Sequence, residues 1–239
     1  MRDASTARTL QSQVVYRLGV SIVRGEFAPG STLPPDAELL ERFGVSRTVL
    51  RESMKALAAK NIVNAKARVG TRVLPRQEWS LFDRDVLAWH LEVGPDLAFM
   101  RSLAEIRVGF ELESAALAAE RRSDAQLARL AALVEAMAEA ETTEAFARAD
   151  LDFHRLVAEA SGNPFMASIG GLVDFVLATA FTISSPVDDT AAKQLTVGRH
   201  RRIADAIAAG DAETAREAMR VVIADGYDRA AGRMALPAN

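Results

Sequence analysis

The sequence predicts a mainly α protein, with an N-terminal winged helix-turn-helix followed by a C-terminal all-α antiparallel helical bundle. Helical periodicity dominates the chain, and the convincing strand pattern is confined to one segment near residues 62–75. The charge also changes sign: residues 1–76 contain 13 Lys or Arg and 6 Asp or Glu, whereas the remainder contains 16 and 26. Small domains can differ in charge by chance, but a basic first part favours contact with a polyanion there.

Composition sets limits on the class of protein. The chain has 239 residues, of which 49% are hydrophobic and 26% charged, a profile typical of one large or two ordinary globular domains. It contains no cysteine, which excludes disulfides and thiolate metal sites. No uninterrupted apolar run reaches the roughly 18 residues of a membrane-spanning helix, and the N-terminus lacks the apolar core of a secretory signal. We therefore expect a cytoplasmic protein.

The first domain, residues 1–76, is expected to contain three helices and a hairpin. Apolar residues from Val14 to Val23 recur at helical spacing and predict a helix over 10–24. Asp36 can cap a helix over 36–43, Gly44 ends it, and Ser46 caps the next helix, which runs to about residue 60. The stretch IVNAKARVGTRVLP then has the composition of two short strands. Three helices followed by a hairpin are the layout of a winged helix-turn-helix.

The rest of the chain is expected to be helical. Residues 77–94 are interpreted as a linker that becomes a short helix, and residues 95–239 as the bundle. Turn signals in SGNP and AGD separate some of its helices. The expected helices cover about 95–119, 123–140, 143–161, 164–184, 188–209 and 211–231.

The predicted helix after Ser46 has the features of a DNA recognition helix. Its apolar residues can pack inward, which leaves polar and cationic side chains outside. Arginine suits bidentate hydrogen bonds to guanine, while hydroxyl groups and a helix N-terminus suit phosphates. The alternative for each residue is an ordinary solvated basic face. The candidates are Ser46, Arg47, Thr48, Arg51 and Lys55 on the helix, with Lys66, Arg68, Gly70 and Arg72 in the wing.

The acidic domain contains a candidate metal site. Asp150 and His154 are four residues apart and share one helix face, and His200 lies on another helix. One carboxylate and two imidazoles are plausible ligands of Zn²⁺ or a similar divalent ion. The alternative is an Asp–His ion pair within one helix and an unrelated histidine. His90 has no such partner in the sequence and is interpreted as structural.

Two stretches of the chain resemble a known family. FAPGSTLPPDAELLERFGVSRTVLRESMKALAAKNIV, followed by a short wing, resembles the DNA-binding domain of the GntR family of bacterial transcription regulators. The resemblance implies that Arg47 and Arg51 contact bases or phosphates and that Ser46 and Thr48 contact phosphates. Many members have arginine where this chain has Ala37, so one contact usual in the family is expected to be absent.

DLDFHRLVAEASGNP and RHRRIADAIAAGDAETAREAM resemble the FCD domain of the FadR branch of that family. The resemblance implies a divalent metal bound by Asp150, His154 and His200, with Val222 at the position where metal-binding members have a fourth ligand, a histidine.

The same resemblance implies that Arg107 and Asn163 bind the effector. Arg107 would pair with an effector carboxylate; the alternative is a buried pair with Glu111 or Glu113. RQEWSLFDRDVLAWHLE is similar to the linker of galactonate-type repressors, which points to a sugar acid.

These expectations combine into a homodimeric, ligand-responsive repressor that binds a palindromic DNA operator and is released by a small carboxylate. Two alternatives remain open from the residues alone. A metal-dependent enzyme could use the Asp and two His residues, although no nucleophile or general base is tied to them by spacing. A DNA-binding protein without an effector could use the bundle only for dimerisation.

Overall fold

The computed structural model describes residues 9–66, 70–94 and 96–235, and divides the chain into two compact units, residues 1–94 and 95–239. Within the described residues, no helix is both long and apolar enough to cross a membrane.

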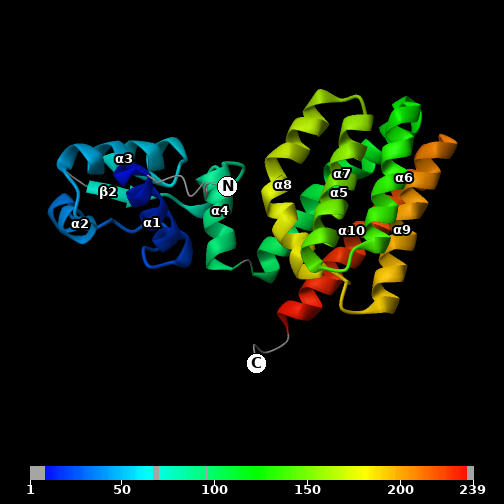
Figure 1. Cartoon of the computed structure of the whole chain (residues 1–239). Coiled ribbons are helices and arrows are strands. Elements are labelled where there is room, and N and C mark those ends of the chain that lie inside the picture. The colour runs from blue at the N-terminus through cyan, green and yellow to red at the C-terminus, as the bar shows by residue number, and fades with distance from the viewer. Residues whose placement is uncertain (1–8, 67–69, 95, 236–239) are drawn as a thin grey trace, which may run out of the picture. The chain divides into compact units, whose positions relative to one another are not determined.

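The first unit is a winged helix-turn-helix, as predicted (Figure 1). Its three helices are α1 (Leu10–Arg24), α2 (Asp36–Phe43) and α3 (Arg47–Ala59). Strands β1 (Val63–Lys66) and β2 (Gly70–Val73) follow as an antiparallel pair, with Val63 opposite Val73 and Lys66 opposite Gly70. Thr32, in the loop after α1, forms an isolated bridge to Arg72 and so joins this loop to the wing.

The turn between α2 and α3 is closed by the residues that the sequence indicates. Gly44 has φ +63° and ends α2, a left-handed conformation that favours glycine. The Ser46 hydroxyl accepts a hydrogen bond from Val49 N at 3.4 Å and caps α3. The prediction that Asp36 caps α2 is wrong, because Pro35 holds the cap position and Asp36 lies in the first turn. There its carboxylate still interacts favourably with the helix dipole.

Residues 77–94 pack into the core of the first unit. A short 3-10 helix η1 (Arg76–Glu78) leads to α4 (Arg84–Val93), which packs on α1. Trp89 of α4 is 2% exposed and covers Gly19 of α1. A Cβ atom at Gly19 would lie 2.5 Å from the Trp89 ring, so only glycine permits this approach. The short helix is therefore built onto the DNA-binding unit.

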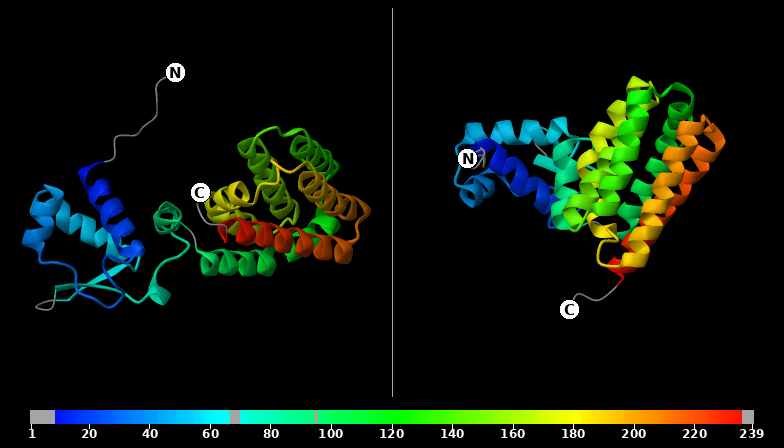
Figure 2. Two further views of the ribbon diagram at one scale, coloured as in Figure 1. Left: turned by 90° about the horizontal axis from the view of Figure 1, so that it is seen from below. Right: turned by 45° about the vertical axis from the view of Figure 1, so that its right-hand side comes forward.

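The second unit is a bundle of helices, as predicted (Figure 2). Helix α7 packs against α5, α6 and α8, and α10 packs along α5 and α9. Large apolar side chains of α7, including Phe146, Phe153 and Leu156, are fully buried. Polar residues on the inward side of α7 are consequently removed from solvent. The helices are α5 (Leu97–Arg121), α6 (Asp124–Glu139), α7 (Thr143–Ala160), α8 (Pro164–Ser184), α9 (Thr190–Ala209) and α10 (Ala212–Met234).

Candidate metal and ligand site

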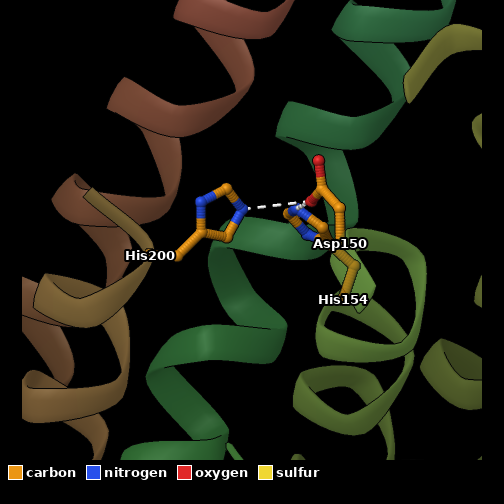
Figure 3. Close-up of side chains that lie close together, drawn as sticks. All are labelled: Asp150, His154 and His200. Carbon is orange, nitrogen blue, oxygen red and sulfur yellow. Dashed lines mark hydrogen bonds and ion pairs between the residues drawn. The ribbon is translucent and has the colours of Figure 1, made fainter. Parts of the chain in front are cut away.

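Asp150, His154 and His200 meet inside the second unit (Figure 3). Asp150 and His154 project from one face of α7, and His200 reaches them from α9; all three are at most 5% exposed. Asp150 Oδ1 lies 3.1 Å from His200 Nε2 and 3.2 Å from His154 Nε2. Ligand atoms about 2.1 Å from a tetrahedral metal ion are about 3.4 Å apart, so these separations fit a small divalent ion. The group could therefore hold a metal ion.

The hydrogen bond of His200 leaves its inward nitrogen suited to a metal. Its Nδ1 lies 2.9 Å from the backbone carbonyl oxygen of Thr196, which can only accept, so Nδ1 carries a proton. In the neutral imidazole, Nε2 then has a lone pair and faces Asp150 Oδ1, which is also an acceptor. Two acceptors at 3.1 Å need a cation between them, either a proton on the ring or a metal ion. Ligating histidines commonly have such a carbonyl partner on the other nitrogen.

His154 contacts charged groups on both sides of its ring. Its Nδ1 lies 2.6 Å from Glu111 Oε2, an ion-pair distance without the alignment of a hydrogen bond. Its Nε2 lies 3.3 Å from Arg107 Nη2, and guanidinium nitrogens only donate. The ring is thus held between a carboxylate at one nitrogen and a cationic donor at the other.

Arg107 pairs with Glu111, one of the two alternatives that its spacing allows. Arg107 Nε donates to Glu111 Oε1 at 2.6 Å and Nη2 donates to Oε2 at 3.2 Å, with both residues on α5 and buried. The Arg107 guanidinium also lies 4.8 Å from the centre of the Phe181 ring. Glu113 instead forms an exposed pair with Arg216. An arginine pointing inward is therefore neutralised within the chain itself.

The electrostatics of the cluster follow from burial and close pairing. Burial alone would raise the pKa of Glu111, but the charges of Arg107 and His154 overcome it and lower this pKa to about 2. The pKa of Asp150 is also lowered, because the two imidazoles outweigh the effect of burial. Burial would lower the pKa of His154, whereas Glu111 and Asp150 raise it overall. The two carboxylates consequently remain ionised in the interior.

Two further positions singled out in the sequence, Val222 and Asn163, make no contact that is described with the Asp150–His154–His200 group. Val222, on α10, is buried in the main apolar core of the unit and offers no ligand atom. Asn163 caps α8, and its side-chain oxygen accepts a hydrogen bond from Phe165 N at 3.0 Å. A contact between Asn163 and an effector stays a prediction.

Spacing pairs Asp150 with His154, and the family resemblance adds His200 and Arg107, but neither singles out Glu111. We expect Glu111 from the sequence only as an alternative partner of Arg107, four residues away. Its approach to His154 depends on the packing of α5 against α7, which spacing along one helix does not reveal. One feature of the sequence could have identified Glu111. Because residues four apart share a helix face, a Glu four residues after an inward-pointing Arg107 also lies on the inward face of α5.

On the DNA-binding unit, the predicted recognition residues lie on one exposed helix. The side chains of Arg51 and Lys55 lie 3.6 and 3.0 Å from Glu52, at the surface. The exposed candidates at the start and along the outer face of α3 are Ser46, Arg47, Thr48, Arg51 and Lys55.

The wing candidates differ from one another. Gly70 has φ +97°, a left-handed conformation that favours glycine. Its predicted approach to DNA is therefore not the only reason for glycine at this position. Lys66 is the last residue of β1, and Arg68 lies outside the described residues. Arg72, expected to face DNA, donates through Nε and Nη2 to the carbonyl oxygen of Gly30 at 3.2 and 2.7 Å. This contact ties Arg72 to the loop after α1.

The first unit is a winged helix with an exposed cationic recognition helix, and the second is a helical unit that buries a polar cluster. Together they define a DNA-binding transcription regulator. Residues 10–73 match the model of bacterial regulatory proteins of the gntR family, and residues 102–225 match the FCD domain. The chain belongs to the GntR family and carries an FCD domain.

The relatives support this assignment. The galactonate operon transcriptional repressor of Escherichia coli K12 is 34% identical and matches over 91% of this chain and 95% of its own length. The repressor NanR of Enterobacter sp. 638 is 31% identical, over 89% of this chain and 82% of its own. Because the family consists of transcription regulators, the metal-dependent enzyme is set aside.

Solved structures agree on the fold. GntR of Streptococcus agalactiae is 26% identical with a TM-score of 0.50, covering 91% of this chain and 99% of its own. Lar, which controls expression of the Listeria monocytogenes agr system, has a TM-score of 0.63 at 22% identity, covering 93% of this chain and 96% of its own.

Proposed function

We propose that this protein is a cytoplasmic repressor that binds a palindromic operator as a homodimer and leaves it when a sugar acid binds the FCD domain. The observation that carries the effector proposal is the buried Arg107 beside the Asp150–His154–His200 group. The relative named for the galactonate operon makes an aldonate the first candidate effector. Two-fold symmetry would present two α3 helices to two half-sites.

A divalent ion, Zn²⁺ or a similar metal, would be held by Asp150, His154 and His200. When bound, it would supply a positive centre for the carboxylate and hydroxyl oxygens of the effector. Val222 leaves the shell with three protein ligands, so a position remains for an oxygen of water or of the effector.

The charge of the metal-loaded cluster suits an anionic effector. Arg107 contributes one positive charge, while Glu111 and Asp150 contribute one negative charge each. Both imidazoles must be neutral to bind a metal, so a divalent ion brings the net charge of the cluster to +1. An effector carboxylate would neutralise this charge. Without the metal, a proton takes the place of the ion between His200 and Asp150. We therefore expect the effector to bind the metal-loaded protein.

The test combines DNA binding with release. Fluorescence anisotropy with the DNA upstream of the neighbouring genes should show sequence-specific binding by the zinc-loaded protein, and galactonate or a related aldonate should weaken it. Arg47→Ala together with Arg51→Ala should abolish specific binding, whereas Arg84→Ala, an exposed change on α4, should not. If the double variant still distinguishes operator from random DNA, the proposed reading helix is wrong. If no aldonate releases the zinc-loaded protein, the effector class is wrong while DNA binding stands.

A further inference from the structure

Glu111 is a buried carboxylate that contacts two side chains, Arg107 and His154. It is 3% exposed and lies between α5 and α7. Its Oε1 accepts from Arg107 Nε at 2.6 Å, and its Oε2 lies 3.2 Å from Arg107 Nη2 and 2.6 Å from His154 Nδ1. One carboxylate oxygen therefore touches both the arginine proposed for the effector and a histidine proposed for the metal.

The contact with Glu111 determines which ring nitrogen of His154 is free. A neutral imidazole has one N–H and one lone pair. A carboxylate oxygen 2.6 Å from Nδ1 favours the proton at that nitrogen, which leaves the lone pair on Nε2. Nε2 is the atom that lies 3.2 Å from Asp150 Oδ1. Through its charge at an ion-pair distance, Glu111 thus favours for His154 the tautomer that the Thr196 hydrogen bond fixes for His200.

We infer that Glu111 is a positioning residue that couples the metal site to Arg107, an inference that rests on the proposed metal binding. Its carboxylate is shared between the two partners. When an effector carboxylate pairs with Arg107, more of the Glu111 charge is available to His154 and the metal is held more tightly. Conversely, a bound metal draws Glu111 toward His154 and leaves Arg107 freer to accept an effector. Linkage requires these two effects to be equal in free energy.

Zinc binding to the full-length protein tests the first half of the inference, with zinc alone as the probe. Glu111→Gln keeps the shape but removes the charge and should weaken zinc affinity about 10- to 100-fold, the usual effect of losing a carboxylate behind a ligating histidine. Glu120→Gln makes the same change on the exposed face of α5 and should leave affinity unchanged. Long-range ¹H–¹⁵N spectra of both metal-free proteins, at a pH at which the His154 ring is neutral, should show the proton on Nδ1 in the parent and a shift toward Nε2 in Glu111→Gln. Unfolding elsewhere would not produce this shift.

A double-mutant cycle tests the coupling. Arg107→Met frees Glu111 and should raise zinc affinity, and the increase should be larger in the parent than in the Glu111→Gln background. Equal increases in the two backgrounds would mean that Arg107 acts on the metal directly, and would overturn the coupling. If Glu111→Gln does not fold, the Arg107→Met/Glu111→Gln variant, which removes both charges of the buried pair, is compared with Arg107→Met.

The remaining outcomes separate this inference from the proposed function. If the parent binds zinc and Glu111→Gln binds it equally well, the role of Glu111 is refuted while the metal site stands. If the parent binds no zinc, the metal site and the role of Glu111 both fall. Weakened zinc binding in Glu111→Gln, with an unchanged Glu120→Gln, supports both.

Discussion

The close contact between Gly19 and Trp89 predicts that a methyl group at Gly19 destabilises the first unit. In Gly19→Ala, the new Cβ would lie 2.5 to 2.6 Å from three ring carbons of Trp89, about 1 Å closer than an ordinary carbon contact. Trp89 is 2% exposed and lies in the core, so its ring can relieve the overlap only by giving up core contacts as it moves toward the neighbouring cavity. Because three atoms of a rigid ring overlap at once, we expect the upper part of the usual cost of overpacking, about 2–3 kcal/mol, offset by about 1 kcal/mol of improved helix propensity. We expect a net loss of about 1–2 kcal/mol in the free energy of unfolding.

Tryptophan fluorescence follows the unfolding of the first unit alone. The chain has two tryptophans, Trp79 and Trp89, and both lie in the core of the first unit. For a unit of this size, the loss corresponds to a midpoint lowered by about 5–15 °C. Gly109→Ala is the matched control on α5, because a Cβ there meets no heavy atom within 4 Å. Its midpoint, followed by circular dichroism, should stay level or rise.

A fluorescence midpoint that is unchanged or higher in Gly19→Ala would contradict this prediction and would mean that α4 can move off α1 at little cost. A second variant, Gly19→Ala/Trp89→Phe, should recover part of the stability relative to the sum of the single changes, because the smaller ring leaves room for the methyl group. The functional interest is that α4 is the helix from which the chain continues into the FCD domain.

Three further predictions concern charge and metal. Arg51→Ala should reduce the slope of log affinity against log salt for operator DNA by about 1 if it neutralises a phosphate, while an unchanged slope would assign Arg51 to base contacts or to none. Zinc at 100 times its Kd should stabilise the second unit by about 2.7 kcal/mol in calorimetry, and Asp150→Ala should abolish this gain; a retained gain would place the metal elsewhere. Because the pKa of Glu111 is lowered from 4.5 to about 2, its contribution to stability is complete above pH 4.5 and is lost as the pH falls toward 2. Glu111→Gln should therefore be least stable relative to the parent near neutral pH, by about 3 kcal/mol, and a gap that stays constant from pH 6 to pH 3 would contradict the assignment.

Local signals account for most of the fold that the sequence predicts. The first helix begins and ends at the predicted residues, because Gly25 adopts φ +90° and stops it. Ser46 and Gly44 define the turn before α3 through their own caps, independently of distant residues. The Asp36 prediction fails because capping preference does not distinguish a residue at the cap from one in the first turn when proline precedes it.

The site is less accessible to prediction, because its geometry depends on how helices pack. Spacing places Asp150 and His154 on one face of α7, but it cannot place His200 3.1 Å away on α9. The resemblance to the family supplied that pairing. Arg72 shows a second limit: its place in the wing suggests DNA, and the sequence does not reveal that the carbonyl of Gly30, distant in sequence, holds its guanidinium. Its contact with DNA stays a prediction. A periodic pattern in the sequence does not show which distant residues long polar side chains will contact.

The space beside Arg107 constrains how an effector can act. The cavity lined by Arg107, Phe181 and Tyr227 has a volume of about 20 Å³, enough for one water molecule and far below the several hundred Å³ of a typical ligand pocket. The proposed sugar acid would not fit this cavity, so its binding at Arg107 would favour an arrangement in which the helices around the cavity have moved apart. Part of its intrinsic affinity is spent on that opening, which lowers the apparent affinity. Unequal binding to the two arrangements is what a releasing effector needs, because an effector that bound both equally could not shift the protein between them.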